Sequence, residues 1–159
     1  MKKLLVLLFL TNILCWSCKK ESETGKISFL TSFAKLSDTI SYDSVSFMEI
    51  KYSELSDIKD TAEYNNPNIY SKSMRLKVDK SEKKNFHFSS EFLDFNDGEH
   101  YIIKSFELTD NAGKVIYYIP YVTPSEYLEN FGYTIINLPI PFSAAKNQKT
   151  SFDLTVIKK

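Results

Sequence analysis

Acid–base or metal chemistry in this sequence would depend first on its two histidines, His87 and His100. A zinc site needs three or four converging ligands, and neither a His-x-x-x-His pair nor a cysteine pair accompanies these residues. A Ser-His-Asp triad stays open because triads are defined by geometry, although the sequence contains no Gly-x-Ser-x-Gly elbow. We therefore predict exposed or loop histidines, no catalytic residue, no metal and no cofactor.

An acidic stretch at residues 94–99, DFNDGE, invites comparison with a calcium-binding loop. The EF-hand register needs oxygen ligands at positions one, three and five and glycine at position six. Here Asp94, Asn96 and Gly98 fall on one, three and five, so the register fails. Two interpretations stay open, a calcium site of another kind and an ordinary polar turn. The chain also contains no glycine-rich phosphate cradle, so we do not expect it to bind a nucleotide.

Tyrosines gather in one segment toward the C-terminus. Tyrosine offers a flat apolar face with a polar hydroxyl, which suits stacking on sugars or packing against a protein partner. Two adjacent tyrosines in one strand must point to opposite faces, so at least one of Tyr117 and Tyr118 is expected outside the core. The alternative is that these rings fill the core and its rim. The candidate ligand-binding residues are Tyr117, Tyr118, Tyr121, Tyr127 and Tyr133.

The N-terminus reads as an export signal. Lys2 and Lys3 precede an apolar run of eleven residues, 4–14. A helix of that length rises only about 16 Å, about half of the roughly 30 Å hydrocarbon core of a bilayer. The run therefore fits the apolar region of a signal peptide, which we assign to residues 1–17.

The residues around Cys18 resemble a lipobox, the site at which lipoprotein signal peptidase cuts before a diacylated cysteine. Ser17 suits the position before the cut, whereas Cys15 and Trp16 depart from the usual pattern of an aliphatic residue three places before the cysteine. An ordinary secretory signal with an incidental cysteine is the alternative. The resemblance implies that Cys18 carries lipid and that residues 18–25 form a flexible tether.

The charged stretch 19–23, KKESE, resembles the short export signal of Bacteroidota surface lipoproteins, which would place the domain on the outer face of the outer membrane. A solvated tether facing the periplasm is the alternative. Without residues 1–17 the chain has 142 residues, 18 basic and 20 acidic, so its formal charge of −2 gives no reason to expect nucleic acid. Apart from Cys18 it contains no cysteine, and hence no disulfide, so its core must hold it together.

The remainder, residues 26–159, alternates apolar and polar residues with the period of half-buried strands. Asp110-Asn111-Ala112-Gly113 predicts the turn of a hairpin over residues 101–121. Pro139 and Pro141 predict an edge strand over 136–142, and Ile102 is expected to share one face with Phe106. We predict an all-β domain of seven to nine strands, a single antiparallel sandwich.

The hairpin, the Leu138–Phe142 segment and the last strand together resemble small Bacteroidota lipoproteins without an assigned activity. The resemblance implies an immunoglobulin-like or transthyretin-like sandwich on a cell envelope, and no catalytic residues. We expect a non-enzymatic, membrane-anchored binding or accessory module whose partner is a glycan or a protein. A structural subunit of an envelope complex is the first alternative, and a hydrolase built from residues far apart in sequence is the second.

Overall fold

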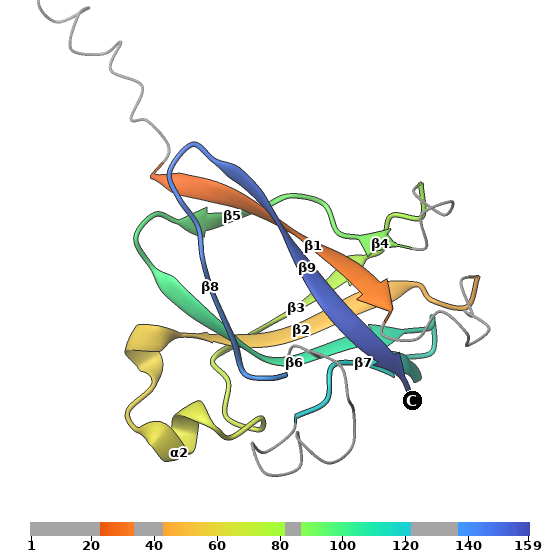
Figure 1. Cartoon of the computed structure of the whole chain (residues 1–159), viewed down its shortest axis with the longest axis horizontal. Helices are drawn as coiled ribbons and strands as arrows, with labels where there is room; N and C mark the ends of the chain where they lie inside the picture. The colour runs from red at the N-terminus through yellow and green to blue at the C-terminus, as the bar shows by residue number, and fades with distance from the viewer. Residues whose placement is uncertain (1–22, 34–42, 82–86, 122–136) are drawn as a thin grey trace, which may run out of the picture.

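The computed structural model describes residues 23–33, 43–81, 87–121 and 137–159, and these residues form an all-β domain (Figure 1). The all-β prediction is thus confirmed. Two short helical turns interrupt the strands, η1 (Leu55–Asp57) and α2 (Thr61–Tyr64). The strands are β1 (Thr24–Phe33), β2 (Phe47–Glu54), β3 (Lys72–Lys77), β4 (Phe88–Ser89), β5 (Leu93–Asn96), β6 (His100–Thr109), β7 (Val115–Tyr118), β8 (Ile140–Ser143) and β9 (Lys149–Lys158).

Hydrogen bonds connect these strands into one curled sheet, in the order β3-β2-β6-β7-β9-β1-β4. Beside this path, β5 pairs with β1 and β8 pairs with β6. The first and last strands, β1 and β9, run parallel over eight residue pairs. They lie opposite β2 and β6, and the core lies between (Figure 1). The domain is therefore a curled half-barrel, whereas the sequence predicts two separate sheets.

The two ends of this path approach each other but do not form a full ladder. Asp79, two residues after β3, forms an isolated antiparallel bridge with Ser89 of β4. Beyond this bridge, β3 pairs only with β2, and β5 pairs only with β1. The half-barrel is therefore held together at the β4 end and open between β3 and β5.

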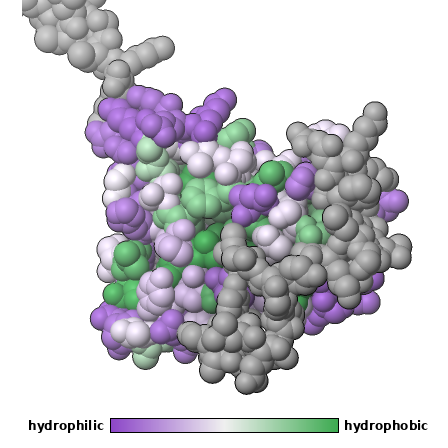
Figure 2. Space-filling view, viewed as in Figure 1, coloured by the Kyte–Doolittle hydropathy of each residue, from purple (hydrophilic) through white to green (hydrophobic). Residues whose placement is uncertain are grey.

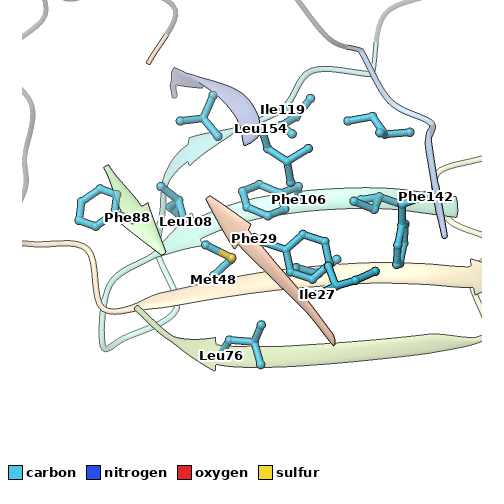
Figure 3. Close-up of a cluster of buried hydrophobic side chains, with 14 of the residues drawn as sticks. Ile27, Phe29, Met48, Leu76, Phe88, Phe106, Leu108, Ile119, Phe142 and Leu154 are labelled. Carbon is cyan, nitrogen blue, oxygen red and sulfur yellow. The ribbon is translucent and has the colours of Figure 1, made fainter. Parts of the chain in front are cut away.

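The core is built from alternating side chains of the facing strands. Ile27 and Phe29 of β1 point toward Met48 of β2 and Phe106 of β6, and all four are at most 1% exposed (Figure 3). Phe29 packs edge-on against Phe142 of β8, with ring centroids 5.8 Å apart. Burial of an aromatic side chain contributes a few kcal/mol, so this cluster is the main source of stability for the described residues, none of which is a cysteine.

The predicted hairpin is confirmed as β6 and β7. Asp110 accepts hydrogen bonds from the backbone N–H groups of Ala112 and Lys114, and Gly113 has a φ of 82°. A side chain with Cβ rarely adopts that φ, which explains the glycine. The predicted edge strand is confirmed as β8, although it begins at Ile140 and pairs with β6 alone.

The expected face of Ile102 is wrong, because a bulge interrupts β6. The register opposite β2 shifts so that Lys51 faces Ser105 and Tyr52 faces Ile103, which leaves Lys104 as the extra residue. A bulge moves the following residues to the other face. Ile103, and not Ile102, therefore joins the core cluster.

The sheet begins two residues earlier than the predicted domain boundary, since Thr24 and Gly25 already pair with β5. The predicted signal peptide and Cys18 lie outside the described residues. No helix of the described residues is long and apolar enough to cross a membrane. Hydrophilic side chains gather at the end of the domain where the N-terminal segment begins (Figure 2); the exposed residues there include Glu23, Lys26, Lys146 and Asn147.

Candidate functional site

A pocket of about 290 Å³ opens between β3 and β5, where the half-barrel is open. We call this gap the slot. Its volume lies near the lower limit for small-molecule sites, so it would hold one large side chain or one sugar ring. The lining residues are Tyr52 of β2, Lys72 and Met74 of β3, Leu93, Asp94, Phe95 and Asn96 of β5, and Tyr101 of β6.

Aromatic rings form the floor of the slot. Tyr52 packs edge-on against Phe95 and against Tyr101, with both pairs of centroids 6.1 Å apart. Phe142 lies beneath them and stacks on Tyr101 at 5.2 Å. Met74 and Leu93 pack against the core but stay partly exposed. The slot therefore presents apolar surface that the chain itself covers only in part.

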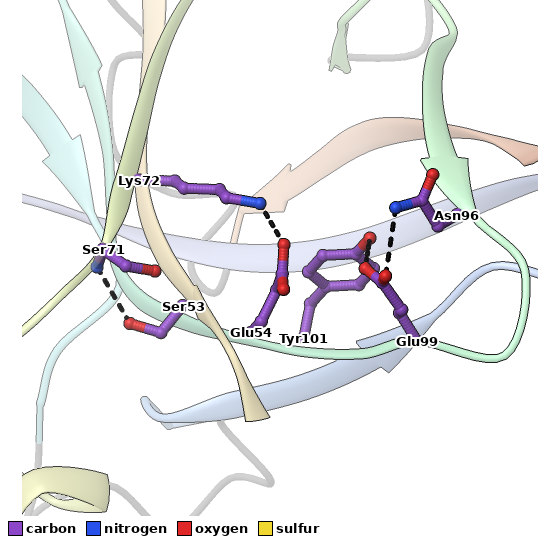
Figure 4. A network of polar contacts seen from close by, with 7 residues as sticks. All are labelled: Ser53, Glu54, Ser71, Lys72, Asn96, Glu99 and Tyr101. Atoms are coloured by element: carbon purple, nitrogen blue, oxygen red, sulfur yellow. Dashed lines mark hydrogen bonds and ion pairs between the residues drawn. The ribbon is translucent and has the colours of Figure 1, made fainter. Parts of the chain in front are cut away.

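Polar side chains surround the mouth of the slot (Figure 4). Lys72 forms an ion pair with Glu54 on one side. On the other side Glu99 accepts hydrogen bonds from the Tyr101 hydroxyl, at 2.7 Å, and from the Asn96 amide, at 3.1 Å. These contacts fix the rim side chains in place before any ligand arrives.

The environment of the rim shifts several pKa values. Burial raises the pKa of Tyr101, and its hydrogen bond to Glu99 raises it further. The same bond, with that from Asn96, lowers the pKa of Glu99. The hydrogen bond to Glu54 raises the pKa of Lys72. Around neutral pH the rim thus carries charged carboxylates and ammonium groups beside neutral tyrosines, a set suited to binding rather than to proton transfer.

The tyrosines singled out from the sequence lie away from the slot. Tyr117 is 2% exposed and packs on Phe33, with centroids 5.0 Å apart. Tyr118 is half-buried on the same strand, β7. The Tyr121 hydroxyl donates to the Asn65 carbonyl. Tyr127 and Tyr133 lie outside the described residues, so the ligand site predicted on these tyrosines stays a prediction.

The histidines do not approach each other in a common site. His87 is half-buried, and its Nδ1 lies 2.8 Å from the Thr31 carbonyl. His100 is exposed at the start of β6. Among the described residues, no three His, Cys, Asp or Glu side chains gather as a metal site would require.

The acidic stretch 94–99 has structural partners. Asp94 pairs with Lys26 at 3.0 Å, and Asp97 accepts the backbone N–H of Lys146 at 2.8 Å. Gly98 turns the chain with a φ of 76°. The stretch therefore joins β5 to β6 as a polar turn, and Asn96 and Glu99 belong to the slot rim.

Sequence reasoning missed Lys104, which is fully buried. Its ammonium group donates to the carbonyls of Glu63 and Tyr64, at 2.5 and 2.6 Å, and burial lowers its pKa. Lys104 thereby fastens α2, part of the connection between β2 and β3, to the outer side of β6. A lysine at an apolar position between Ile103 and Phe106 was the available signal.

Comparisons with known proteins add little. No family model matches the sequence, and no curated protein matches it. Among solved structures, a leucine-rich repeat protein from Bacteroides thetaiotaomicron aligns with a TM-score of 0.49 and 15% identity over 85% of this chain. The alignment spans 12% of that protein's length.

Proposed function

We propose that the protein is a lipid-anchored, non-enzymatic binding module of a bacterial cell envelope, and that the slot is its ligand site. We place the ligand site in the slot because the slot combines an aromatic floor with a polar rim at the open side of the half-barrel. Apolar surface with a few fixed polar groups is typical of ligand sites.

The anchoring part of the proposal rests on the sequence. The lipobox-like residues before Cys18 and the charged stretch 19–23 support an outer-membrane lipoprotein with the domain on the cell surface. The hydrophilic end of the domain beside Glu23 suits a short tether to a lipid headgroup layer (Figure 2). The periplasmic orientation is the alternative.

The binding part can be tested without knowing the ligand, because the mature chain has no cysteine besides Cys18. Met74→Cys places a single thiol at the slot, and Tyr118→Cys places one on β7, which is remote from it in the strand order. The rate of thiol labelling by a small maleimide is measured for each variant twice. One measurement uses the detergent-purified lipoprotein, and the other uses envelopes of the native organism.

An occupied slot predicts that Met74→Cys reacts at least tenfold more slowly in the envelope than in the purified protein, while Tyr118→Cys reacts equally in both. Equal rates for Met74→Cys in the two preparations would refute the siting. If Tyr118→Cys alone reacted more slowly in the envelope, the ligand site would lie on the tyrosine segment predicted from the sequence.

The anchor has its own test. Cys18→Ser removes the thiol that lipoprotein signal peptidase and the diacyl transfer require, so the variant should keep residues 1–17 and lack lipid. The readouts are the mass of the chain and its partition into detergent. Processing of Cys18→Ser at the same site as the parent would show an ordinary secretory signal instead. Protease shaving of intact cells then separates the two orientations.

A structural subunit of an envelope complex is the second candidate. The unpaired edges of β3 and β5 favour it, because exposed edges are where other chains add strands. Native gel migration after mild detergent extraction discriminates between them. Migration at monomer mass would argue against a permanent complex.

We also infer that the half-barrel is related to immunoglobulin-like or transthyretin-like sandwiches. Its two halves are joined on the β7 side by only two residue pairs, Tyr117 with Lys158 and Tyr118 with Ile157. Without those two pairs and the isolated bridges Asp79–Ser89 and Asp97–Ala144, two facing sheets would remain, which is the sandwich arrangement.

A further inference from the structure

We propose that the slot takes an extended segment of a partner polypeptide, which adds a strand along β3 and places one apolar side chain over Tyr52 and Phe95, between Met74 and Leu93. This inference rests on the proposed function and names the ligand class of the same site. Four observations lead to it: the direction of backbone groups on β3, their direction on β5, the partly exposed Met74 and Leu93 beside the floor, and the charge of the rim.

The free edge of β3 points into the slot. The N–H of Val78 donates to Ser46 on the β2 side, at 3.1 Å, whereas the N–H of Asp79 donates to Ser89 on the other side, at 2.7 Å. Backbone groups alternate in direction along a strand. The N–H and C=O groups of Ser73, Arg75 and Lys77 therefore face away from β2 and toward the slot.

The edge of β5 shows the same alternation from the other side. The N–H of Asp97 donates to the Glu23 carbonyl, at 2.8 Å, in the direction of β1. The backbone groups of Asp94 then face the slot, and the Asn96 N–H on the same side hydrogen-bonds the Tyr101 hydroxyl. An extended peptide would find donors and acceptors spaced for a ladder, which a ring-shaped small molecule does not need.

The slot also offers an anchor position. Side chains of an added strand alternate, so every second one would point toward the aromatic floor. Met74 and Leu93 flank that floor and are only partly buried. One leucine, methionine or phenylalanine side chain there would complete the apolar cover at the open side of the half-barrel.

The charged side chains of the rim favour a bound peptide that carries a positive charge. Glu54 is paired with Lys72 and Asp94 with Lys26, whereas the Glu99 carboxylate accepts its hydrogen bonds from uncharged groups, the Tyr101 hydroxyl and the Asn96 amide. A basic residue near the apolar anchor is the complement.

The test uses the lipidated protein in detergent micelles and a set of fluorescent hexapeptides. Each has leucine, methionine or phenylalanine at its third position, arginine at its fifth and threonine elsewhere. We expect at least one to bind, and the same peptide with N-methyl groups on alternate amides to bind at least tenfold more weakly. N-methylation keeps the side chains and removes the ladder hydrogen bonds.

A variant of the protein tests the same ladder. Ser73→Pro removes an N–H that faces the slot and that β2 does not use, and edge strands tolerate proline. It should weaken the best peptide at least tenfold with an unchanged circular dichroism spectrum. Tyr118→Ala should leave the affinity unchanged. If Ser73→Pro does not fold, the N-methyl comparison still decides.

Two outcomes would overturn strand addition and leave the proposed function standing. One is equal binding of the N-methylated and parent peptides. The other is no binding of any peptide while an oligosaccharide protects Met74→Cys from labelling. The proposed function itself fails by a different result, equal labelling of Met74→Cys in envelopes and in the purified protein.

Discussion

The two ends of the gap between β3 and β4–β5 differ in how the strand edges meet. At the closed end Asp79 and Ser89 exchange backbone hydrogen bonds, and Phe88 beside them is fully buried. At the open end the facing residues are Lys72 of β3 and Asn96 of β5, and side chains with a pocket between them replace the bridge. The same two edges are therefore sealed by backbone at one end and lined by side chains at the other.

This contrast indicates what each end is for. At the closed end the hydrogen bonds are internal, so the residues there contribute to stability and are not available to a ligand. At the open end Met74 and Leu93 leave part of their apolar surface exposed beside the buried rings, and exposed apolar surface is typical of binding sites. Variants at the closed end should thus affect folding, and variants at the rim should affect binding. The following predictions test that division.

The largest effect is expected beneath the slot, where the floor merges with the core. Phe142 is 4% exposed and contacts Phe29, Phe95 and Tyr101. Phe142→Ala should lower the free energy of unfolding by about 3–5 kcal/mol, because it removes buried surface and leaves a cavity. Denaturant unfolding measures it, with exposed Pro141→Ala as the control. A loss below about 1 kcal/mol would mean that the floor collapses easily and is no part of a rigid core.

A smaller loss is expected at the closed end. The Thr31 hydroxyl donates to the Phe88 carbonyl and accepts from the Phe88 N–H, both at 3.2 Å. Thr31→Val keeps the volume but removes both of these buried hydrogen bonds, at a cost of about 1–3 kcal/mol. The matched control is Thr155→Val, because the Thr155 hydroxyl bonds only the half-buried Ser32 hydroxyl. Equal effects of the two variants would show that the closed end is not specially stabilised.

The sequence predicted the local elements of this fold better than their assembly. The Asp110–Gly113 turn and the prolines of β8 act through local backbone geometry, so their effects are visible in the residues themselves. The bulge at Lys104 is different, because it arises where β6 must match β2 across more than 40 residues of chain. No local pattern specifies such a register.

The slot could not have been predicted, because it is a property of strand order. Tyr52 lies more than 40 residues before Phe95 and Tyr101, and all three read as ordinary strand aromatics. Tyr117 and Tyr118 attracted attention because they belong to a segment rich in tyrosine, and clustering along the chain does not bring side chains of a strand to one face. The curl of the sheet determines which aromatics lie at an opening.

An alkaline titration separates buried tyrosines of the slot floor from exposed ones. Because burial and Glu99 raise the pKa of Tyr101 in the folded state, its share of stability is present below about pH 10, its unfolded value, and is lost as the pH rises above it. Tyr101→Phe should therefore lose less stability than the parent between about pH 9 and pH 11. Denaturant unfolding at both pH values, with tyrosinate absorbance, checks it. Lys104 has a lowered pKa, so its contribution to stability rises with pH. Because the parent and Tyr101→Phe both contain Lys104, this contribution cancels in the comparison.

The smallest effect on folding is expected at the rim. Lys72 is half-exposed and its pair with Glu54 lies in solvent, so Lys72→Met should change the free energy of unfolding by at most about 1 kcal/mol. The same substitution removes one of two ammonium groups from the mouth of the slot, so a basic peptide should bind more tightly, and the gain should shrink in high salt. Unfolding and peptide binding measured on one preparation check both. If Lys72→Met lost much stability and bound the peptide unchanged, the assignment of binding to the open end would be wrong. The rim would then stabilise the sheet rather than bind a ligand.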